Sequence, residues 1–339
     1  MRQAVMTQPG VIEYREVPAP APGPGEVLLR VKRIGVCGSD VHVWHGQHPF
    51  TSYPVVQGHE FSAVIEAVGA GVTSLKPGQR ATAAPQVVCG TCKPCQRGDY
   101  HICDQLKVRG FQAPGCAQDL FLTEEFRLVP FPDNISFDEG AVIEPVAVAA
   151  HSTARAGNLT GKNVVVFGAG PIGNLVAQGA KCRGAAKVLI TDVSDFRLQK
   201  ATEVGIDATC NVSREPLAHA VQAAFGDEGF NVAFECAGVE ASLDDAVQNI
   251  QKGGLIVVLA VYGQRPRVDM AIVNDRELTL TGTLMYQQSD YRQAVEWLAS
   301  GDMKAAPLIT KHFPFEAYAD AYRFIDQHSS SCLKVMIDL

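Results

Sequence analysis

The fold is decided by the stretch Val164-Val165-Val166-Phe167-Gly168-Ala169-Gly170-Pro171-Ile172-Gly173. Its β-branched beginning is typical of a buried strand, and its glycines open the helix that follows. Gly168 permits a tight turn, Gly170 lets the backbone approach a pyrophosphate, and Gly173 lets helix and strand pack closely. Because the helix N-terminus also offers unpaired N–H groups to phosphates, the pattern predicts a dinucleotide site. The residues expected to contact the dinucleotide are Gly168, Gly170, Pro171, Ile172 and Gly173.

An acidic residue follows the next expected strand, Lys187–Thr191. At that position Asp192 can accept both ribose hydroxyls of an adenosine, and its charge would repel the 2′-phosphate of NADP. Arg197 could stack on the adenine or, alternatively, accommodate that phosphate. Because Asp192 stands at the strand end itself, the sequence predicts NAD as the cofactor. The competing interpretation is a simple glycine turn in a sheet together with a solvated aspartate.

Strands and helices alternate around this motif. The Ala-rich stretch from Pro145 to Ala156 has helical spacing and is expected to form a helix. Buried-type runs after it are expected to form strands at 162–167, 187–191, 232–236 and 255–260. Helical segments lie between them, and such alternation is typical of a parallel, doubly wound Rossmann sheet. We expect this domain to span residues 149–285.

The first 150 or so residues have a different sequence pattern. Short β-like runs, such as 27–31 and 63–68, alternate with glycine and proline turns, which is typical of an all-β domain. The tail is expected to form two amphipathic helices and a strand, at about 291–300, 318–327 and 333–337. We expect the tail to pack back on the first domain. The result is an α/β protein whose β-rich domain is discontinuous, spanning residues 1–148 and 286–339.

The composition excludes several classes of protein. The chain has 339 residues, of which 47% are hydrophobic and 19% charged, so it can bury enough apolar surface to fold. A net charge of −7 without a basic run argues against nucleic-acid binding. No apolar run is long enough to span a membrane, and the first ten residues do not resemble a signal peptide. We expect a cytoplasmic protein whose partner is a small molecule.

Four of the ten cysteines fall within fifteen residues, spaced Cys89-x2-Cys92-x2-Cys95-x7-Cys103. Four thiolates on a short loop can close tetrahedrally on Zn²⁺ and leave no position for water. An iron–sulfur cluster and unrelated buried cysteines are the alternatives. A closed four-thiolate site is structural, because it clips a loop and contributes folding energy rather than chemistry.

A second set of metal-binding side chains is dispersed along the chain and comprises Cys37, His59, Glu60 and Glu144. One sulfur, one nitrogen and one or two oxygen ligands suit Zn²⁺ with a position left for water or substrate. Spacing alone does not assign these residues. An isolated cysteine is usually part of a core, an isolated histidine is usually hydrogen-bonded, and a glutamate near an apolar run is often a helix cap.

Taken together, the motifs resemble the zinc-dependent medium-chain dehydrogenase/reductase superfamily. The shared features run in order along the chain: CGSDVH at 37–42, Gly58-His59-Glu60 with Gly69 and Gly71 downstream, the four-cysteine loop and the GxGxxG turn. Glu60 and the Glu144-Pro145 pair are most similar to the sorbitol (polyol) dehydrogenase, threonine dehydrogenase and L-galactonate oxidoreductase branches. The resemblance implies a GroES-like catalytic domain, a Rossmann domain and NAD(P)-linked oxidation of a secondary alcohol.

The resemblance also implies the metal ligands residue by residue. Cys37 and His59 match the catalytic zinc ligands, and Glu60 matches the third ligand of sorbitol-dehydrogenase-like enzymes. Glu144 matches a carboxylate that either binds zinc directly or orders its water. The four-cysteine loop matches the structural site, so two zinc ions per chain are expected.

Further matches concern the proton and the substrate. Ser39 and His42 match a proton relay from the substrate hydroxyl to solvent, although a plain surface histidine is the competing interpretation of His42. Zn²⁺ would act as a Lewis acid, and hydride would pass to the nicotinamide. Tyr286 matches a residue that orients the polyol in sorbitol dehydrogenases, but their preceding arginine is Met285 here, which argues against sorbitol itself.

The expected substrate is a polyol or a sugar acid, because Glu60 and Glu144 make the pocket polar and buried hydroxyls need hydrogen-bond partners. A threonine-type or other alcohol dehydrogenase is the alternative. A zinc-free quinone or enoyl reductase, or a non-catalytic nucleotide-binding regulatory protein, would lack metal ligands that this chain retains. The alternating stretch 277–282 predicts an edge strand that pairs in a homodimer or homotetramer, with an ordinary edge strand as the competing interpretation.

Overall fold

The computed structural model describes residues 1–339, and the chain divides into two compact units. Unit 1 comprises Met1–Glu144, Gln287–Ala299 and Ile309–Leu339, and unit 2 comprises Pro145–Tyr286 and Ser300–Leu308. Each unit has a hydrophobic core. The chain first passes from unit 1 to unit 2 inside a helix, α3 (Phe137–Arg155).

Unit 2 is built on a six-stranded sheet in which every neighbouring pair of strands is parallel. In spatial order the strands are β12 (Ala208–Asn211), β11 (Lys187–Asp192), β10 (Asn163–Phe167), β13 (Val232–Glu235), β14 (Leu255–Val258) and β15 (Thr279–Gly282). The first strand along the chain lies in the middle and the order reverses there. This is the doubly wound arrangement, so the predicted fold class is confirmed.

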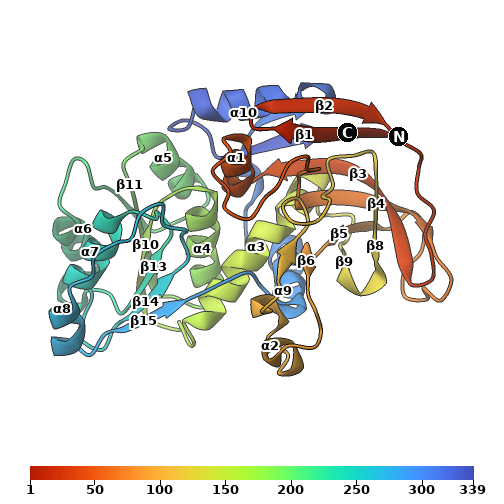
Figure 1. Cartoon of the computed structure of the whole chain (residues 1–339). Coiled ribbons are helices and arrows are strands. Elements are labelled where there is room, and N and C mark those ends of the chain that lie inside the picture. The colour runs from red at the N-terminus through yellow and green to blue at the C-terminus, as the bar shows by residue number, and fades with distance from the viewer. The chain divides into compact units, whose positions relative to one another are not determined.

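Helices cover both faces of this sheet. They are α4 (Pro171–Cys182), α5 (Asp195–Glu203), α6 (Leu217–Phe225), α7 (Glu240–Asn249) and α8 (Met270–Asp275). Figure 1 shows α4 on one side of the sheet and α6 and α7 on the other. A strand covered on both faces needs apolar side chains in succession, and Val164–Phe167 in the central strand are all buried.

Unit 1 is rich in β-strands. Its main sheet has the order β16 (Ile309–Pro314), β17 (Lys334–Asp338), β3 (Glu26–Val36), β4 (Glu60–Val68), β5 (Arg80–Ala83) and β9 (Leu128–Pro130), and β8 (Leu120–Glu124) also pairs with β3. Two small sheets are formed by β1 (Arg2–Gln8) with β2 (Val11–Glu16), and by β6 (Gln86–Val87) with β7 (Lys107–Val108). The helices are α1 (Gly38–Trp44), α2 (Lys93–Gln96), α9 (Gln288–Ser300) and α10 (Tyr318–Gln327).

The late strand β17 lies between β16 and β3, parallel to the first and antiparallel to the second. Its register places Val335 opposite Val36, while on the other side of β3 Gly35 lies opposite Glu60. Three segments that are far apart in the sequence therefore meet at one end of the sheet. From the tail, β16, α10 and β17 all belong to unit 1.

Helix α3 begins earlier than the sequence pattern indicated. Its residues were expected from Pro145 onward, but the helix starts at Phe137 and contains Pro145 in its interior. Ser136 explains the start, because its hydroxyl accepts the N–H of Glu139 at 3.2 Å while the Glu139 carboxylate accepts the N–H of Ser136 at 3.1 Å. This reciprocal capping box fixes the helix N-terminus. None of the helices is both long and apolar enough to cross a bilayer.

The tail of the chain is divided between the two units. Gln287–Ala299 and Ile309–Leu339 belong to unit 1, whereas Ser300–Leu308 belongs to unit 2. The side-chain amide of Gln178 on α4 explains this, because it accepts the N–H of Lys304 at 2.7 Å and donates to the carbonyl of Lys304 at 3.3 Å. A short segment of the tail is thereby fixed against α4.

Candidate metal and cofactor sites

Part of the dispersed metal-binding set is assembled in unit 1. Cys37 follows β3 and begins α1, and His59 immediately precedes Glu60, the first residue of β4. One ligand atom from each of Cys37, His59 and Glu60 lies within 4.8 Å of the other two. His59 and Glu60 are buried and Cys37 is half-buried. A sulfur, a nitrogen and an oxygen at this spacing fit a zinc ion.

The pairing of β3 with β4 explains how Glu60 reaches this group. Gly35 is the strand partner of Glu60, and a Cβ atom on it would lie 2.4 Å from Oε2 of Glu60. Glycine therefore leaves the space that the Glu60 carboxylate occupies. No local pattern in the sequence indicates this requirement, because Gly35 acts on a residue of the neighbouring strand.

Asp40 holds two of the three candidate ligands in place. Its Oδ2 accepts the N–H of Cys37 at 3.0 Å, and its Oδ1 lies 3.5 Å from Nδ1 of His59. Burial alone would lower the pKa of His59, but Asp40 and Cys37 outweigh that effect and raise it well above its usual value. A carboxylate that orients a metal-binding histidine is a common outer partner in zinc sites. From sequence alone, an aspartate at this place in a helix is explained by capping.

A buried lysine from β17 pairs with Glu60. Nζ of Lys334 lies 2.8 and 2.6 Å from the two carboxylate oxygens of Glu60 and 3.3 Å from the carbonyl oxygen of Val36. Lys334 is only 3% exposed and Glu60 only 1%. Burial alone would lower the pKa of Lys334, but Glu60, Cys37 and Glu144 raise it above its usual 10.5. Lys334 therefore stays charged and balances the acidic groups predicted to bind zinc.

The other residues predicted for catalysis lie near this group in the sequence or the fold. Ser39 and His42 are three positions apart on α1, which places them on one face of the helix. Ser39 is half-buried and His42 is exposed. Glu144 is buried in α3, but it falls outside the group formed by the other three ligands. Its role as a ligand stays a prediction.

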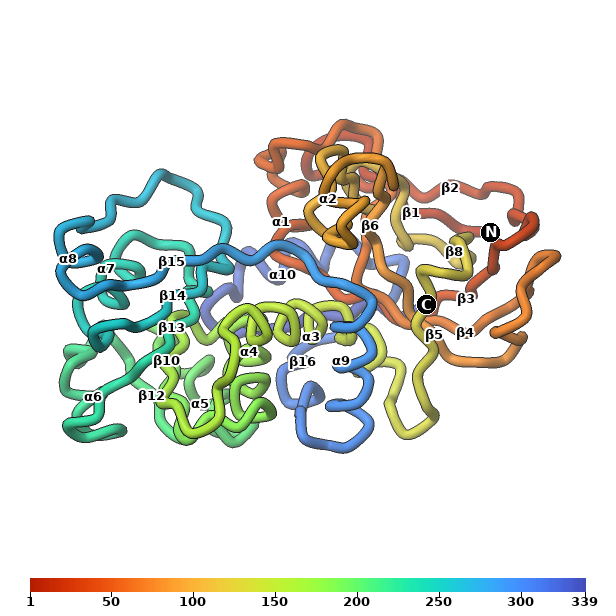
Figure 2. The backbone as a smooth tube through the Cα atoms, turned by 90° about the horizontal axis from the view of Figure 1, so that it is seen from below, coloured from red at the N-terminus to blue at the C-terminus, as the bar shows by residue number.

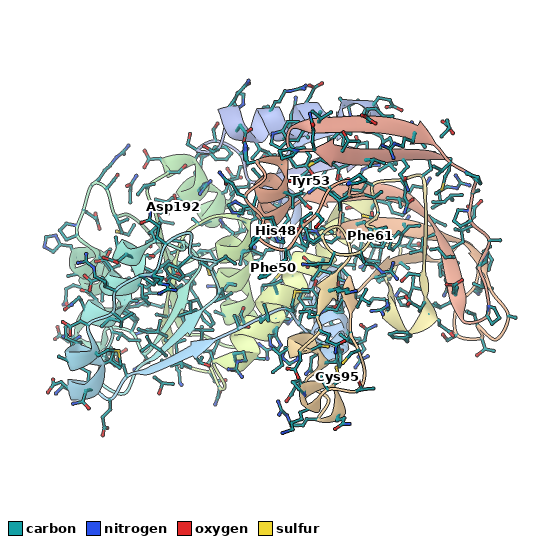
Figure 3. The ribbon with its side chains drawn as sticks, in the orientation of Figure 1. His48, Phe50, Tyr53, Phe61, Cys95 and Asp192 are labelled. Atoms are coloured by element: carbon teal, nitrogen blue, oxygen red, sulfur yellow. The ribbon has the colours of Figure 1, made fainter.

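The four-cysteine loop forms a second cluster in unit 1. Ligand atoms of Cys89, Cys92, Cys95 and Cys103 all lie within 4.8 Å of one another. The loop follows β6 and contains α2, and Figure 2 shows its tight winding. Cys95 on this loop is labelled in Figure 3. Four sulfur atoms at this spacing fit a closed tetrahedral zinc site.

Backbone N–H groups prepare this cluster for metal. Thr91 and Cys92 donate their N–H groups to Sγ of Cys89, at 3.4 and 3.3 Å. These donors lower the pKa of Cys89 to about 6. Burial and the neighbouring thiols raise the pKa of Cys95 to about 12. Thiolates are the form that binds metal, and a divalent cation would stabilise the thiolate form of all four cysteines, including Cys95 with its raised pKa.

The predicted cofactor turn joins β10 to α4 in unit 2. Gly168 has a φ of 95°, and a Cβ atom on Gly173 would lie 1.7 Å from the carbonyl oxygen of Gly168. At Gly170, in contrast, no atom lies within 4 Å of where a Cβ would be. The residues from Pro171 to Gly173 form the first turn of α4. The fold therefore requires glycine at positions 168 and 173. The space beside Gly170 is open, as a turn that binds a phosphate needs.

Asp192 ends β11 beside this turn. Its Oδ2 accepts the N–H of Ala169 at 2.8 Å, and its Oδ1 accepts those of Val193 and Ser194 at 2.8 and 2.9 Å. Nη1 of Arg197 lies 3.7 Å from the same carboxylate. Asp192 therefore ties β11 to the glycine turn, and Arg197 is held next to it.

Glu235, at the carboxyl end of β13, fixes the neighbouring loop. Its Oε1 accepts the N–H groups of Ala237 and Gly238 at 3.0 and 2.9 Å and the hydroxyl of Ser242 at 2.6 Å. This loop packs against the glycine turn, because a Cβ on Gly168 would lie 3.0 Å from the nitrogen of Ala237. The loops after β10 and β13 flank the point where the strand order reverses, where doubly wound sheets bind ligands. No pattern in the sequence indicates this role of Glu235 beyond the presence of an acidic residue at a strand end.

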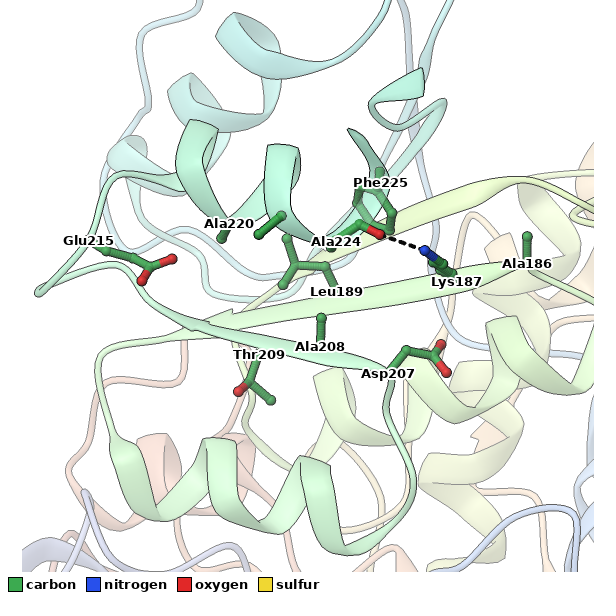
Figure 4. A pocket seen from close by; sticks show the side chains of 11 residues that line it. Ala186, Lys187, Leu189, Asp207, Ala208, Thr209, Glu215, Ala220, Ala224 and Phe225 are labelled. Carbon is green, nitrogen blue, oxygen red and sulfur yellow. Dashed lines mark hydrogen bonds between the residues drawn. The ribbon is translucent and has the colours of Figure 1, made fainter. Parts of the chain in front are cut away.

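A hollow of about 560 Å³ lies next to α6, β11 and β12 in unit 2 (Figure 4). Among its lining residues, Lys187 is the first residue of β11 and Asp207 directly precedes β12. These residues mark the amino ends of the strands, opposite the end that carries the glycine turn. Lys187 is also engaged, because its ammonium donates to the carbonyl of Ala224 at 2.9 Å. We therefore assign this hollow no part in cofactor binding.

Tyr286 is fully buried, and Met285 before it has a φ of 51°. Such a backbone conformation is uncommon for a residue other than glycine. A side chain without exposed surface is not the environment expected for a substrate contact. The substrate role of Tyr286 therefore stays a prediction.

Two family models match the chain. Residues 23–133 match the alcohol dehydrogenase GroES-like domain, and residues 171–300 match the zinc-binding dehydrogenase domain. Among curated relatives, the L-threonine 3-dehydrogenase of Rhizobium johnstonii is 34% identical and covers 100% of this chain and 98% of its own length. The sorbitol dehydrogenase 2 of Saccharomyces cerevisiae is 35% identical, over 96% of this chain and 94% of its own length.

Solved dehydrogenase structures are also similar to this chain over its whole length. An alcohol dehydrogenase from Escherichia coli CFT073 complexed with NADH superposes with a TM-score of 0.92 at 31% identity, covering 100% of this chain and 99% of its own. A zinc-binding dehydrogenase from Sinorhizobium meliloti 1021 bound to NADP gives 0.91 at 28% identity, with the same coverage. The L-idonate 5-dehydrogenase of Escherichia coli gives 0.89 at 26% identity, covering 100% of this chain and 98% of its own.

The glycine turn yields a prediction with a matched pair of variants. Gly173→Ala should lower the stability of the protein by about 1–3 kcal/mol, because its methyl group would collide with the backbone at Gly168. Gly170→Ala should leave stability unchanged, since its φ of −64° suits alanine and the space around it is open. It should nevertheless weaken NADH binding, because the methyl group would stand where a pyrophosphate approaches. Thermal unfolding and NADH fluorescence titration measure the two effects, and wild-type NADH affinity in Gly170→Ala would contradict the assignment.

The Lys334–Glu60 pair yields a second prediction. In the metal-free protein, Lys334→Met should lower the stability by about 3–5 kcal/mol, because it leaves the Glu60 carboxylate buried without a counter-charge. Since the pKa of Lys334 is raised on folding, this contribution is fully present at neutral pH and disappears only as the pH rises through the raised value, above 10.5.

Urea unfolding of three variants measures this contribution. The double variant Lys334→Met/Glu60→Gln should recover part of the loss, because no unpaired charge remains. Lys252→Met is the control, since the Lys252–Asp275 pair is exposed and should contribute at most about 1 kcal/mol. Equal stability of Lys334→Met and Lys252→Met would show that the buried pair is not needed.

Proposed function

We propose that this chain, which belongs to the zinc-dependent medium-chain alcohol dehydrogenase family, transfers a hydride between NAD and a secondary alcohol of a polyol or sugar acid. Membership rests on full-length relatives at 34 and 35% identity, and the resemblance inferred from the motifs is confirmed. The observation that carries the proposed activity is the group of Cys37, His59 and Glu60, whose ligand atoms lie within 4.8 Å of one another.

The side chains present fit two zinc ions. Cys37, His59 and Glu60 would hold the first, with Glu144 as a further carboxylate, and the four cysteines between 89 and 103 would hold the second. Zinc in the first site supplies Lewis-acid chemistry toward a substrate oxygen. The second site has four thiols and no open position, so its contribution is to folding.

The residues around the first site prepare it for this role. Asp40 fixes His59 and the amide of Cys37, and Lys334 fixes the direction of the Glu60 carboxylate. Ser39 takes the proton of the substrate hydroxyl and passes it to His42. His42 is exposed, so it exchanges the proton with water.

NAD is favoured over NADP by Asp192. Its two oxygens accept three backbone N–H groups, and a carboxylate has about four acceptor positions, so one remains for a ribose hydroxyl instead of the two expected from the sequence. A 2′-phosphate at the same place would meet the negative charge. The solved relatives do not decide between the two cofactors, because one is complexed with NADH and another is bound to NADP. The proposed preference for NAD therefore rests on Asp192.

The substrate class follows from the polarity of the site and from the relatives. Glu60 and Glu144 are both buried acidic groups, so the surroundings of the metal group are polar and suit a compound with several hydroxyls. Sorbitol dehydrogenase 2 and L-idonate 5-dehydrogenase are named for a polyol and a sugar acid. L-Threonine is the second candidate, because a relative with 34% identity is named for it.

The test is an NAD-reduction screen of the zinc-loaded protein. The compounds are alditols, aldonates, inositols, L-threonine and 2-propanol, each with NAD and with NADP. We expect the best rate with an alditol or an aldonate and a higher kcat/KM for NAD. Activity on aliphatic alcohols alone would defeat the proposed substrate class, and an equal kcat/KM for NADP would defeat the role of Asp192.

Two cysteine variants serve as controls in this screen. Cys37→Ser should fold and bind NADH but be inactive and hold one zinc per chain instead of two. Cys92→Ser should be destabilised, because the 89–103 loop loses its metal. Normal turnover by Cys37→Ser would contradict the catalytic assignment.

We also propose that the protein forms a homodimer or homotetramer through β15. This strand is at the edge of the unit 2 sheet, and Leu280 on it, Leu284 after it and Met270 nearby in the sequence are exposed. An edge strand with exposed apolar residues favours pairing with a second copy. Sedimentation at micromolar concentration should show a dimer or tetramer, and a monomer alone would contradict the proposal.

A reducing, cytoplasmic location is proposed from the cysteines. All ten are free thiols, including the four that face one another in the 89–103 loop. Thiols persist in reducing compartments, and only the reduced loop can bind zinc.

A further inference from the structure

The segment after α1 carries two histidines with different surroundings. Nε2 of His45 pairs with Oδ1 of Asp326 at 2.9 Å, which ties the segment to α10. Nδ1 of His48 lies 2.8 Å from the hydroxyl of Thr51, within the segment itself. His45 therefore has a structural role, since it joins this segment to α10. The contact of His48 with Thr51 orients its ring but does not explain why a histidine is present there.

His48 lies in a row of aromatic rings that ends at a candidate metal ligand. Its ring is stacked on Phe111, with centroids 4.6 Å apart and planes 17° apart. Phe111 in turn contacts the ring of His59, at 4.9 Å between centroids. Phe50 stands edge-on to His48 at 6.2 Å and is 72% exposed, and Figure 3 shows His48 and Phe50 side by side. The row connects the metal group to a partly exposed surface.

The imidazole of His48 has one ring nitrogen available. Nδ1 is held by Thr51, and Nε2 makes no hydrogen bond within the protein. Burial lowers the pKa of His48, and the nearby His42 and His59 lower it further, against the opposing charge of Asp40. A neutral imidazole with one nitrogen engaged offers a single hydrogen-bonding atom at the other, which suits a hydroxyl group.

We propose that His48 is a substrate-binding residue: its Nε2 hydrogen-bonds a hydroxyl of the substrate other than the one that is oxidised, and Phe50 and Phe111 supply apolar faces for the C–H groups of the same molecule. Phe111 separates His48 from His59, so the two histidines contact different parts of the substrate. Polyols and sugar acids carry hydroxyls several carbons from the reacting one, with C–H groups between them. This inference rests on the proposed function and narrows it to substrates with at least one additional hydroxyl.

The test compares two variants of the zinc-loaded full-length protein. His48→Phe keeps a ring to stack on Phe111 but removes the nitrogen, and His48→Gln places an amide nitrogen near the position of Nε2. On the best alditol or aldonate of the screen, His48→Phe should raise KM about tenfold with kcat within about twofold, the loss expected for one hydrogen bond. His48→Gln should recover most of this increase.

Simple alcohols and the integrity of the protein provide the controls. The kcat/KM for 2-propanol should change by less than about twofold in both variants, because 2-propanol has no second hydroxyl. Zinc content and melting temperature should match the wild type.

Four outcomes would overturn the inference. An unchanged KM in His48→Phe would show that His48 does not bind the substrate. An equal loss of kcat on every alcohol, 2-propanol included, would place His48 in proton transfer instead. Oxidation of 2-propanol but of no polyhydroxylated compound by the wild type would overturn this inference and leave the zinc-dependent alcohol chemistry standing, whereas no NAD reduction with any alcohol would overturn both.

Discussion

The arrangement of unit 1 depends on one buried ion pair, between Lys334 of β17 and Glu60 of β4. Two opposite charges that are almost completely removed from water are stable only if they remain together. Their contact therefore fixes the position of β17 relative to β4, with β3 between them. Gly35 on β3 leaves room for the carboxylate, and Asp40 just beyond β3 orients the remaining ligands. The geometry of the metal group is thus a consequence of how three strands pair.

The two candidate sites are built in different ways. The cofactor turn is local, because a single connection between β10 and α4 supplies the glycines and the helix N-terminus, and Asp192 and Glu235 only brace it. The metal group is non-local, because its ligands and their partners come from β3, α1, β4 and β17. A substitution in the glycine turn should therefore disturb only the connection between β10 and α4. A substitution in the Lys334–Glu60 pair should disturb the packing of the whole main sheet of unit 1.

This difference explains what the sequence could predict. The glycine turn and the four-cysteine loop are contiguous, so residue type and spacing indicate their chemistry directly. Cys37, His59 and Glu60 were found only through a family resemblance, since their proximity depends on strand pairing. Lys334 and Gly35 escaped prediction because each acts on Glu60 from another strand. The early start of α3 had a local signal in Ser136 and Glu139, but Pro145 suggested a later beginning.

The separation of Glu60 and Lys334 has a consequence for synthesis of the protein. Their positions differ by 274 residues, and the whole of unit 2 lies between them in the sequence. A ribosome therefore releases Glu60 long before Lys334, and during that interval the nascent β-rich segment cannot bury its acidic group against a partner. The doubly wound part can fold first, because its strands are translated consecutively. The metal group is then completed late, so that a chain interrupted before β17 would expose an unfinished sheet to cellular quality control.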